Sequence, residues 1–169
     1  MSINSYFTKT TSSIGFFGNN KESKEYGSAG SGVIIGGDKE QGEAYIITNY
    51  HVVYDADADV KISNKIFVYL YGQELDKYKI SATYIGGPMS HDIAVLKIQS
   101  AVYKESNAHA ATIGKSGDMT VGDSVIAIGN PNAGGIAVTQ GILSMESEYI
   151  TMTAADNVST VQIRVMRVD

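Results

Sequence analysis

Short runs of apolar residues, separated by glycine-rich or charged segments, recur through the chain and restrict the folds it can adopt. Several runs alternate, as where Ile66, Val68 and Leu70 are interleaved with polar or aromatic residues. Such alternation predicts strands with one buried face. About six short strands are expected before residue 100, at the spacing typical of a β-sandwich or barrel. The predicted strands include 33–35, 44–47, 60–71, 77–85 and 92–98.

The composition agrees with a globular β protein. Of the 169 residues, 43% are hydrophobic and 18% are charged, which is typical of folded chains rather than disordered ones. Eighteen glycines and eleven tyrosines favour turns and strands, and no pattern of a helical bundle is present. The length is sufficient for one domain, or two small ones, with a hydrophobic core.

Charge and residue types exclude several classes of function. The net charge is −5 and no basic stripe is present, so we expect no nucleic-acid partner. The absence of cysteine excludes a disulfide scaffold, a thiolate zinc site and a cysteine nucleophile.

Three aspartates alternate as they do in a calcium-binding loop, at Asp55, Asp57 and Asp59. However, Val60 stands where such a loop needs glycine, and Ile66 where it needs the closing glutamate. We therefore expect a solvated turn here, and we assign no metal and no cofactor to this chain.

The N-terminal residues carry no recognisable targeting signal. Residues 1–7 lack the apolar core of a signal peptide, and no apolar run approaches the length of a membrane span. Two locations remain open: the cytoplasm, or the cell envelope or exterior if an export signal or anchor lies upstream of this chain.

Changes in pattern divide the chain into four parts. Residues 1–26 are a polar segment, 27–100 a first β-barrel, 101–116 a connector and 117–169 a partial second β-barrel. In the polar segment only three residues are expected to pack: Ile14, Phe16 and Phe17. The second barrel is expected to contain about four strands, too few to close it. These strands are predicted at 121–129, 136–145, 149–153 and 158–168.

A histidine and an aspartate stand beside two of the predicted strands. His51 follows the apolar run 44–47, and Asp92 opens the run 92–98. An imidazole takes a proton from a nucleophile efficiently only when a partner fixes its tautomer and stabilises the imidazolium. A carboxylate at the head of a neighbouring strand does both. The sequence therefore predicts a His–Asp pair, two of the three parts of an acyl-transfer site.

The other two histidines are weaker candidates. His91 is adjacent to Asp92, but neighbours on a strand face opposite sides, so we expect it to serve a turn. His109 lies in the alanine-rich connector without a partner, and we expect it at the surface. Asp92 also suits a strand-capping role, in which its carboxylate accepts backbone N–H groups. The two roles of Asp92 are compatible.

Five segments, in this order, resemble the trypsin-like serine proteases of the HtrA/Deg type. They are 30–35, 45–53, 92–98, 121–131 and 138–144. The resemblance implies a double antiparallel β-barrel, all-β, with the active site in the cleft between the barrels. It also implies that His51 is the general base, that Asp92 is the orienting acid, and that unfolded proteins or peptides are the substrates. It allows a homo-oligomer of the full-length protein.

The nucleophile of that family is absent from these residues. It lies in a Gly-[Asn/Asp]-Ser-Gly-Gly segment, and 167–169 resemble only the approach to it. We therefore expect the chain to end just before the serine, the oxyanion hole and the specificity pocket. Ser116 superficially matches such a segment, but it precedes the strands of the second barrel, whereas the family's serine follows several of them. No residue of this chain is assigned as the nucleophile.

These observations predict a serine-type endopeptidase of the HtrA-like, protein quality control class. Residues 1–169 alone are expected to be inactive, and to aggregate or need a partner because the open second barrel leaves strand edges unpaired. The alternative is a non-catalytic β-barrel module, a pseudoprotease or fragment, that captures peptides by edge-strand pairing.

Overall fold

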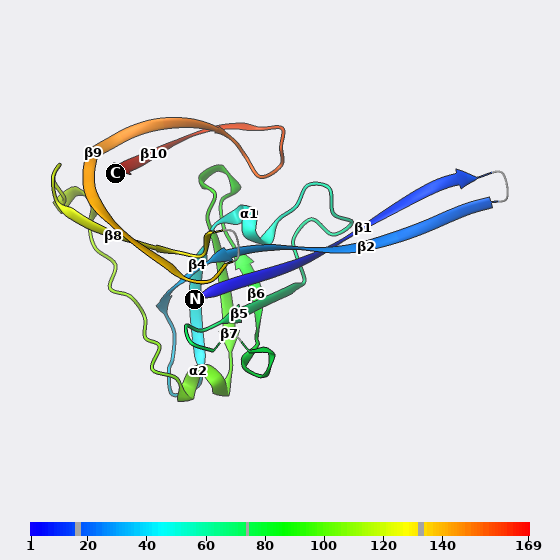
Figure 1. The fold of residues 1–169 in the computed structure, drawn as a ribbon, viewed down its shortest axis with the longest axis horizontal. Coiled ribbons are helices and arrows are strands. Elements are labelled where there is room, and N and C mark those ends of the chain that lie inside the picture. The colour runs from blue at the N-terminus through cyan, green and yellow to red at the C-terminus, as the bar shows by residue number, and fades with distance from the viewer. Residues whose placement is uncertain (16–17, 74, 132–133) are drawn as a thin grey trace.

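The computed structural model describes residues 1–15, 18–73, 75–131 and 134–169, which form two antiparallel sheets (Figure 1). The larger sheet contains β1 (Ser2–Gly15), β2 (Gly18–Ser31), β3 (Val33–Gly36), β4 (Glu43–Thr48), β5 (Lys65–Tyr69), β6 (Ile80–Gly86) and β7 (Ala94–Gln99). The smaller contains β8 (Ser124–Gly129), β9 (Ala137–Thr153) and β10 (Thr160–Val168). The short helices are α1 (Tyr50–Val53), η1 (Asp76–Tyr78), η2 (Met89–His91), α2 (Ala101–Glu105) and η3 (Ser116–Asp118). The predicted all-β class is confirmed.

The larger sheet, with strand order β2-β1-β5-β6-β7-β4-β3, curls so that its two edges converge. The edge strands β2 and β3 are consecutive in the chain and are separated only by Gly32. A Cβ atom at Gly32 would lie 2.6 Å from the Ile3 side chain and 2.7 Å from that of Ile46, so a larger residue does not fit. Among the described residues no ladder joins β2 to β3. The ladders of the larger sheet therefore do not close into a complete ring, and the chain passes from one edge strand to the other at Gly32.

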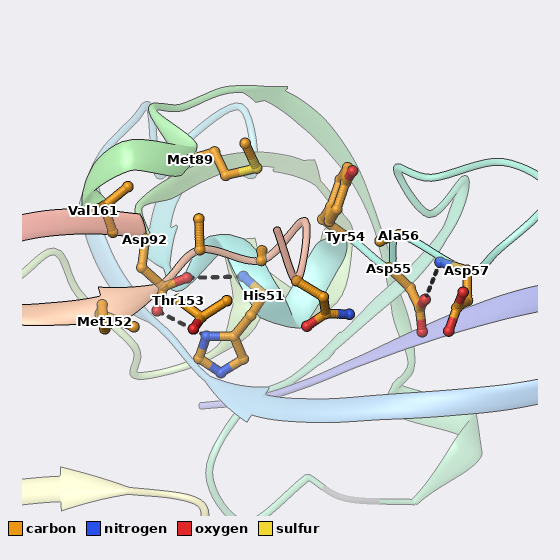
Figure 2. A pocket seen from close by; sticks show the side chains of 13 residues that line it. His51, Tyr54, Asp55, Ala56, Asp57, Met89, Asp92, Met152, Thr153 and Val161 are labelled. Atoms are coloured by element: carbon orange, nitrogen blue, oxygen red, sulfur yellow. Dashed lines mark hydrogen bonds and ion pairs between the residues drawn. The ribbon is translucent and has the colours of Figure 1, made fainter. Parts of the chain in front are cut away.

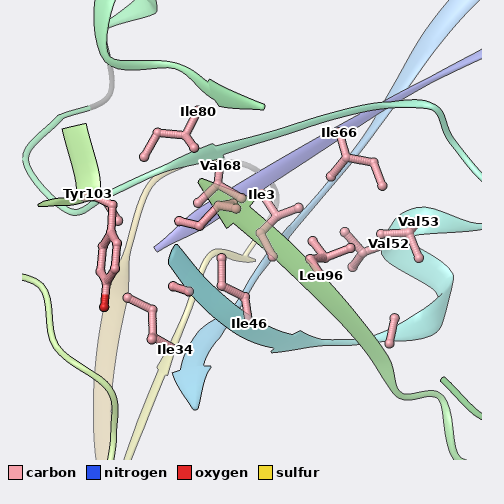
Figure 3. Close-up of a cluster of buried hydrophobic side chains, with 14 residues drawn as sticks. Ile3, Ile34, Ile46, Val52, Val53, Ile66, Val68, Ile80, Leu96 and Tyr103 are labelled. Atoms are coloured by element: carbon pink, nitrogen blue, oxygen red, sulfur yellow. The ribbon is translucent and has the colours of Figure 1, made fainter. Parts of the chain in front are cut away.

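The core lies inside this curled sheet (Figure 3). On β4 and β7 the inward side chains alternate, as at Ala44, Ile46, Ala94, Leu96 and Ile98, which are all at most 1% exposed. The whole cluster is Ile3, Ile34, Ala44, Ile46, Val52, Val53, Ile66, Val68, Leu70, Ile80, Ala94, Leu96, Ile98 and Tyr103. Because β4 pairs with β7 from Glu43–Gln99 to Thr48–Ala94, the end of β4 lies beside the start of β7. This register brings together the two segments that carry His51 and Asp92.

The polar N-terminal segment begins with residues that take part in the larger sheet. β1 pairs with β5 through Ser2–Tyr6, and Ile3 and Phe7 are only 0% and 3% exposed. The short alternation of Ile3, Ser5 and Phe7 places these side chains on one face, which packs into the barrel. The packing expected of three residues lies outside what the structure describes: Ile14, Phe16 and Phe17.

Beyond Phe7, β1 and β2 leave the sheet as a two-stranded arm, residues 8–15 and 18–26, that projects from the molecule (Figure 1). The loop after α1 fastens the root of the arm. Asp59 accepts hydrogen bonds from the backbone N–H of Thr10 (3.0 Å) and from its hydroxyl (2.6 Å), and the Asp59 N–H donates to the carbonyl of Thr8 (2.9 Å). The two bonds that Thr10 donates lower the pKa of the Asp59 carboxyl, the hydroxyl being the larger cause.

The smaller sheet has three strands rather than the four expected. β9 runs without a break from Ala137 to Thr153, across the two segments predicted separately. The pairing of β9 with its partner β10 is irregular near the end of β10, where the register shifts between Val165 and Val168. Leu143 is fully buried, but this sheet leaves much apolar surface exposed, including Ile126 at 65% and Ile128 at 64%.

The connector is held against the larger sheet by a partly buried lysine. The ammonium of Lys39 donates to the Tyr103 carbonyl, the Ser106 hydroxyl (3.0 Å) and the Ala108 carbonyl (2.9 Å). It also lies 4.0 Å from the centre of the Tyr103 ring. Burial lowers the pKa of Lys39, and the three acceptors offset the cost of burying its charge.

Two strands begin later than the alternation predicted. The expected strand 60–71 is observed as Lys65–Tyr69, because the backbone before it folds back in bonds such as Ser63 N–H to the Val53 carbonyl (2.9 Å). The expected strand 77–85 begins at Ile80, after the η1 turn. Within the described part of the chain, no helix is long and apolar enough to cross a membrane.

The buried position of Ile46 predicts a large loss of stability on truncation. Ile46→Ala removes a side chain that is 0% exposed, so the free energy of unfolding should fall by about 2–5 kcal/mol. The same change at Ile126, which is 65% exposed, should cost less than about 1 kcal/mol. Urea denaturation followed by circular dichroism measures both. Equal losses in the two variants would contradict this assignment of the core.

The fastening of the arm predicts a pH dependence. Because the pKa of Asp59 is lowered from its usual 3.8, its ionised form stabilises the arm root above that pH, and this stabilisation is lost as the pH falls through the lowered pKa. Thr10→Val removes the main cause and should raise the Asp59 pKa toward 3.8. Carboxyl ¹³C NMR titration measures it. In the control Thr11→Val, whose hydroxyl bonds to Glu22 instead, the Asp59 pKa should not move.

Candidate functional site

His51 lies on α1, a single helical turn that begins directly after β4 and Asn49. The sequence analysis placed it at the exit of a strand, and the strand ends three residues earlier, at Thr48. Val52 and Val53, which are 2% and 0% exposed, anchor the helix in the core. A Cβ atom on Gly30 would lie 2.5 Å from Val52, so β2 approaches the helix this closely only with glycine there.

Asp92 does not open a strand, as the sequence suggested, but ends the η2 turn, two residues before β7. Its backbone has φ 52° and ψ 42°, in the left-handed region that few non-glycine residues adopt. Aspartate is among the residues that tolerate this conformation. The Asp92 N–H donates to the Met89 carbonyl (3.1 Å), which holds the turn in this shape.

The carboxylate of Asp92 binds His51 at two points (Figure 2). Its Oδ2 lies 2.8 Å from Nδ1 of the imidazole, and its Oδ1 accepts the backbone N–H of His51 at 2.9 Å. Asn49 adds a third donor, because its side-chain amide donates to Oδ2 at 3.1 Å. The Asp92 side chain is 16% exposed and that of His51 is 60% exposed.

This geometry leaves one ring nitrogen of His51 available. Since the carboxylate accepts at Nδ1, the neutral imidazole carries its proton there and presents Nε2 as an acceptor. Among the described residues Nε2 has no hydrogen-bond partner, and the ring faces a cavity. The arrangement can accept a proton at Nε2 and stabilise the imidazolium that results.

Tyrosines pack around the helix that carries His51. The Tyr50 ring lies 5.3 Å from the ring of Tyr54 and 6.2 Å, edge to face, from the ring of Tyr84. Burial, and then the neighbouring Tyr84, raise the pKa of Tyr50. The backbone N–H of Tyr50 donates to the Asp92 carbonyl (3.1 Å), so the turn and the helix are joined by main chain as well.

A family model described as a trypsin-like peptidase domain matches residues 30–167. The chain belongs to the trypsin-like peptidase domain family. Its similarities are to members of the HtrA type. It is 37% identical over 145 residues to the serine protease Do-like HtrA of Lactococcus lactis subsp. cremoris, and 35% identical over 144 residues to that of Bacillus subtilis. These matches cover 84% of this chain but only 31% and 28% of the two relatives.

Solved structures agree on the fold. The HtrA-type protease AlgW with decapeptide matches 96% of this chain and 51% of its own, at a TM-score of 0.53 and 26% identity. The Rv3671c protease of M. tuberculosis in its active form matches 99% of this chain at a TM-score of 0.59, and at 18% identity it supports the fold alone. The trypsin-like β-barrel fold is therefore confirmed, with sheets that are not closed.

The structure does not bring the remaining sequence candidates into the site of this trypsin-like domain. His91 is exposed and its Nδ1 lies 3.0 Å from the hydroxyl of Ser90. It belongs to a turn as expected, although for another reason, because it lies in η2 and not on a strand. His109 is exposed. Ser116 is exposed in η3 and has no hydrogen bond to His51 or Asp92 among the described contacts.

The three alternating aspartates make separate contacts. Asp55 Oδ1 accepts the backbone N–H of Asp57 (2.8 Å), which forms a turn. Asp57 lies 3.6 Å from the ammonium of Lys9, and Asp59 binds Thr10 in the arm. The loop 55–59 therefore connects α1 with the arm.

Sequence reasoning missed the other parts of the site. Asn49, which binds Asp92, was identifiable only from its place directly before the helix of His51. Met89 and the β9–β10 turn, residues 153–160, also border the cavity, but they come from distant parts of the chain. Their position depends on tertiary packing, for which the local pattern contains no signal.

The Asp92 contact predicts the tautomer of His51. In Asp92→Asn the new amide oxygen can still accept the hydrogen bond from the backbone N–H of His51. The amide NH₂ group then faces Nδ1 of the ring, so Nδ1 must act as a hydrogen-bond acceptor. The neutral imidazole should therefore shift from the Nδ1–H to the Nε2–H tautomer, as measured by ¹⁵N NMR of the ring. The control is Asp118→Asn, an exposed acid in η3, which should leave the tautomer unchanged. Retention of Nδ1–H in Asp92→Asn would contradict the assignment.

Proposed function

We propose that this domain acts in a serine-type endopeptidase, with His51 as general base and Asp92 as the residue that orients it. The observation that supports the proposal is the 2.8 Å contact between Nδ1 and the carboxylate, with Nε2 unoccupied by any described residue. A serine hydroxyl that attacks a peptide carbonyl passes its proton to Nε2, and Asp92 stabilises the charged ring. The proton then goes to the leaving amine as the peptide bond breaks.

The proposed substrates are unfolded proteins and peptides. The relatives are named as serine proteases, and one solved neighbour holds a decapeptide. An extended peptide can pair with an open strand edge, and β8 and β10 are the edge strands of the smaller sheet. The 169 residues contain no Gly-[Asn/Asp]-Ser-Gly-Gly segment, and we assign none of them as the nucleophile.

The second candidate is a peptide-binding module without catalysis. It is favoured by the absence of that serine segment from the 169 residues, together with the exposed apolar side chains Ile126 and Ile128 on the edge strand β8. Such a module would bind peptides by strand pairing and would not need the His51 imidazole.

A chimera separates the two functions. Residues 1–169 are fused to the part of the B. subtilis HtrA relative that carries the serine segment, and casein hydrolysis is measured. We expect hydrolysis that falls by about 10³-fold or more in His51→Ala, because a triad without its base loses most of its rate. His91→Ala, a histidine outside the site, should retain the activity. Equal hydrolysis by the His51→Ala chimera would exclude His51 as general base.

The unfused 169-residue polypeptide is the companion measurement. It should hydrolyse casein no faster than its own His51→Ala variant, because both the nucleophile and the oxyanion donors are lacking. Turnover clearly above that variant would show that a residue within the chain serves as the nucleophile and would require the assignment to be revised.

A further inference from the structure

A cavity of about 390 Å³ adjoins the His51–Asp92 pair (Figure 2). The loop after α1 forms one wall, with Tyr54, Asp55 and Asp57, and the β9–β10 turn forms the opposite wall. Because His51 lines this space, a substrate whose peptide bond reaches Nε2 must place a neighbouring side chain in or beside it. The chemistry of the walls therefore determines which side chains are accepted.

The ionisable groups of the cavity are negative. Besides His51, the lining contains the carboxylates of Asp55, Asp57 and Asp92, and no lysine or arginine. The Asp92 carboxylate accepts hydrogen bonds from His51 and Asn49. The negative charge of Asp57 is partly compensated by the Lys9 ammonium, 3.6 Å away. Asp55 uses Oδ1 to accept the Asp57 N–H and has no cationic partner among the described residues.

The aspartates of the loop 55–59 lie near Tyr26. Burial raises the pKa of Tyr26, a polar side-chain contact with Asp55 raises it further, and the negative charges of Asp55, Asp57 and Asp59 contribute less. The loop thus carries a negative potential that disfavours a second anion. A cleft lined with one sign of charge attracts the opposite charge.

The remaining walls are apolar. Met89 comes from η2, Met152 from the end of β9 and Val161 from the start of β10. All three are partly buried. A ligand that fits both the apolar walls and the acidic wall of the cavity has an aliphatic stem and a cationic head. Lysine and arginine side chains have this form.

We propose that this cavity is a substrate subsite for a lysine or arginine side chain, with Asp55 as the residue that sets the preference. The inference rests on the proposed function, because it takes a peptide near Nε2 as the occupant. A bound metal ion does not account for the carboxylates, since the described residues contain no group of three His, Asp or Glu side chains placed to hold one.

The test is an NMR titration of the ¹⁵N-labelled chimera described above, with its nucleophilic serine replaced by alanine, against capped alanine-based hexapeptides that carry one lysine, norleucine or glutamate. Norleucine keeps the aliphatic stem and removes the charge. We expect the lysine peptide to bind up to about five-fold more tightly than the norleucine peptide, the range of a solvent-accessible ion pair. The amides of Tyr54, Asp55 and Ala56 should shift, and the preference should shrink at high salt.

Asp55→Asn is the decisive variant. Its amide oxygen can still accept the Asp57 N–H, so the turn is retained while the charge is lost. The lysine preference should disappear, whereas Asp118→Asn, in η3 outside the cavity, should keep it. A preference that persists in Asp55→Asn, equal binding of all three peptides, or no shifts at residues 54–56 would each overturn the subsite. The protease proposal is judged separately, by the dependence of the chimera on His51.

Discussion

The contact between Asp92 and His51 is the interaction on which the functional site depends. One carboxylate fixes residue 51 twice, through its backbone N–H and through its ring, and so determines both the start of α1 and the direction of the imidazole. Two features make this contact possible. The β4–β7 register places Thr48 opposite Ala94, and the left-handed backbone of Asp92 turns its side chain back toward the helix. A slip of one residue in that register would reverse the faces of the strand and separate the pair.

Much of this arrangement was predictable from the sequence, because it follows from period-two patterns. The alternation in 44–48 and 94–98 identifies the inward side chains; the first pattern ends three residues before His51, and the second begins two residues after Asp92. The residue types also restricted the chemistry, since a chain without cysteine offers no thiolate. The site pair and the β class could therefore be proposed before any coordinates were considered.

The remaining features could not be predicted because tertiary contacts decide them. Nothing local distinguishes Asp92 as the first residue of a strand from Asp92 as the end of a turn. Likewise, Ile3 and Phe7 stand in a polar context, yet Ile3 is buried where β1 pairs with β5, and Phe7 is buried where it stacks on Tyr26. β9 crosses a polar stretch without a break because its ladder with β10 takes up the irregularity at Val165 to Val168. In each case a partner distant in sequence overrides the local preference.

The loop 55–59 connects the cavity beside His51 with the two-stranded arm, because it borders the cavity on one side and is bonded to the arm on the other. Its two attachments to the arm differ in strength. The ion pair of Asp57 with Lys9 is long and exposed, and pairs of this kind contribute about 0–1 kcal/mol. Asp59 instead makes three hydrogen bonds to Thr8 and Thr10, two of them accepted by its carboxylate. Asp59 therefore makes the stronger of the two attachments between the loop and the arm.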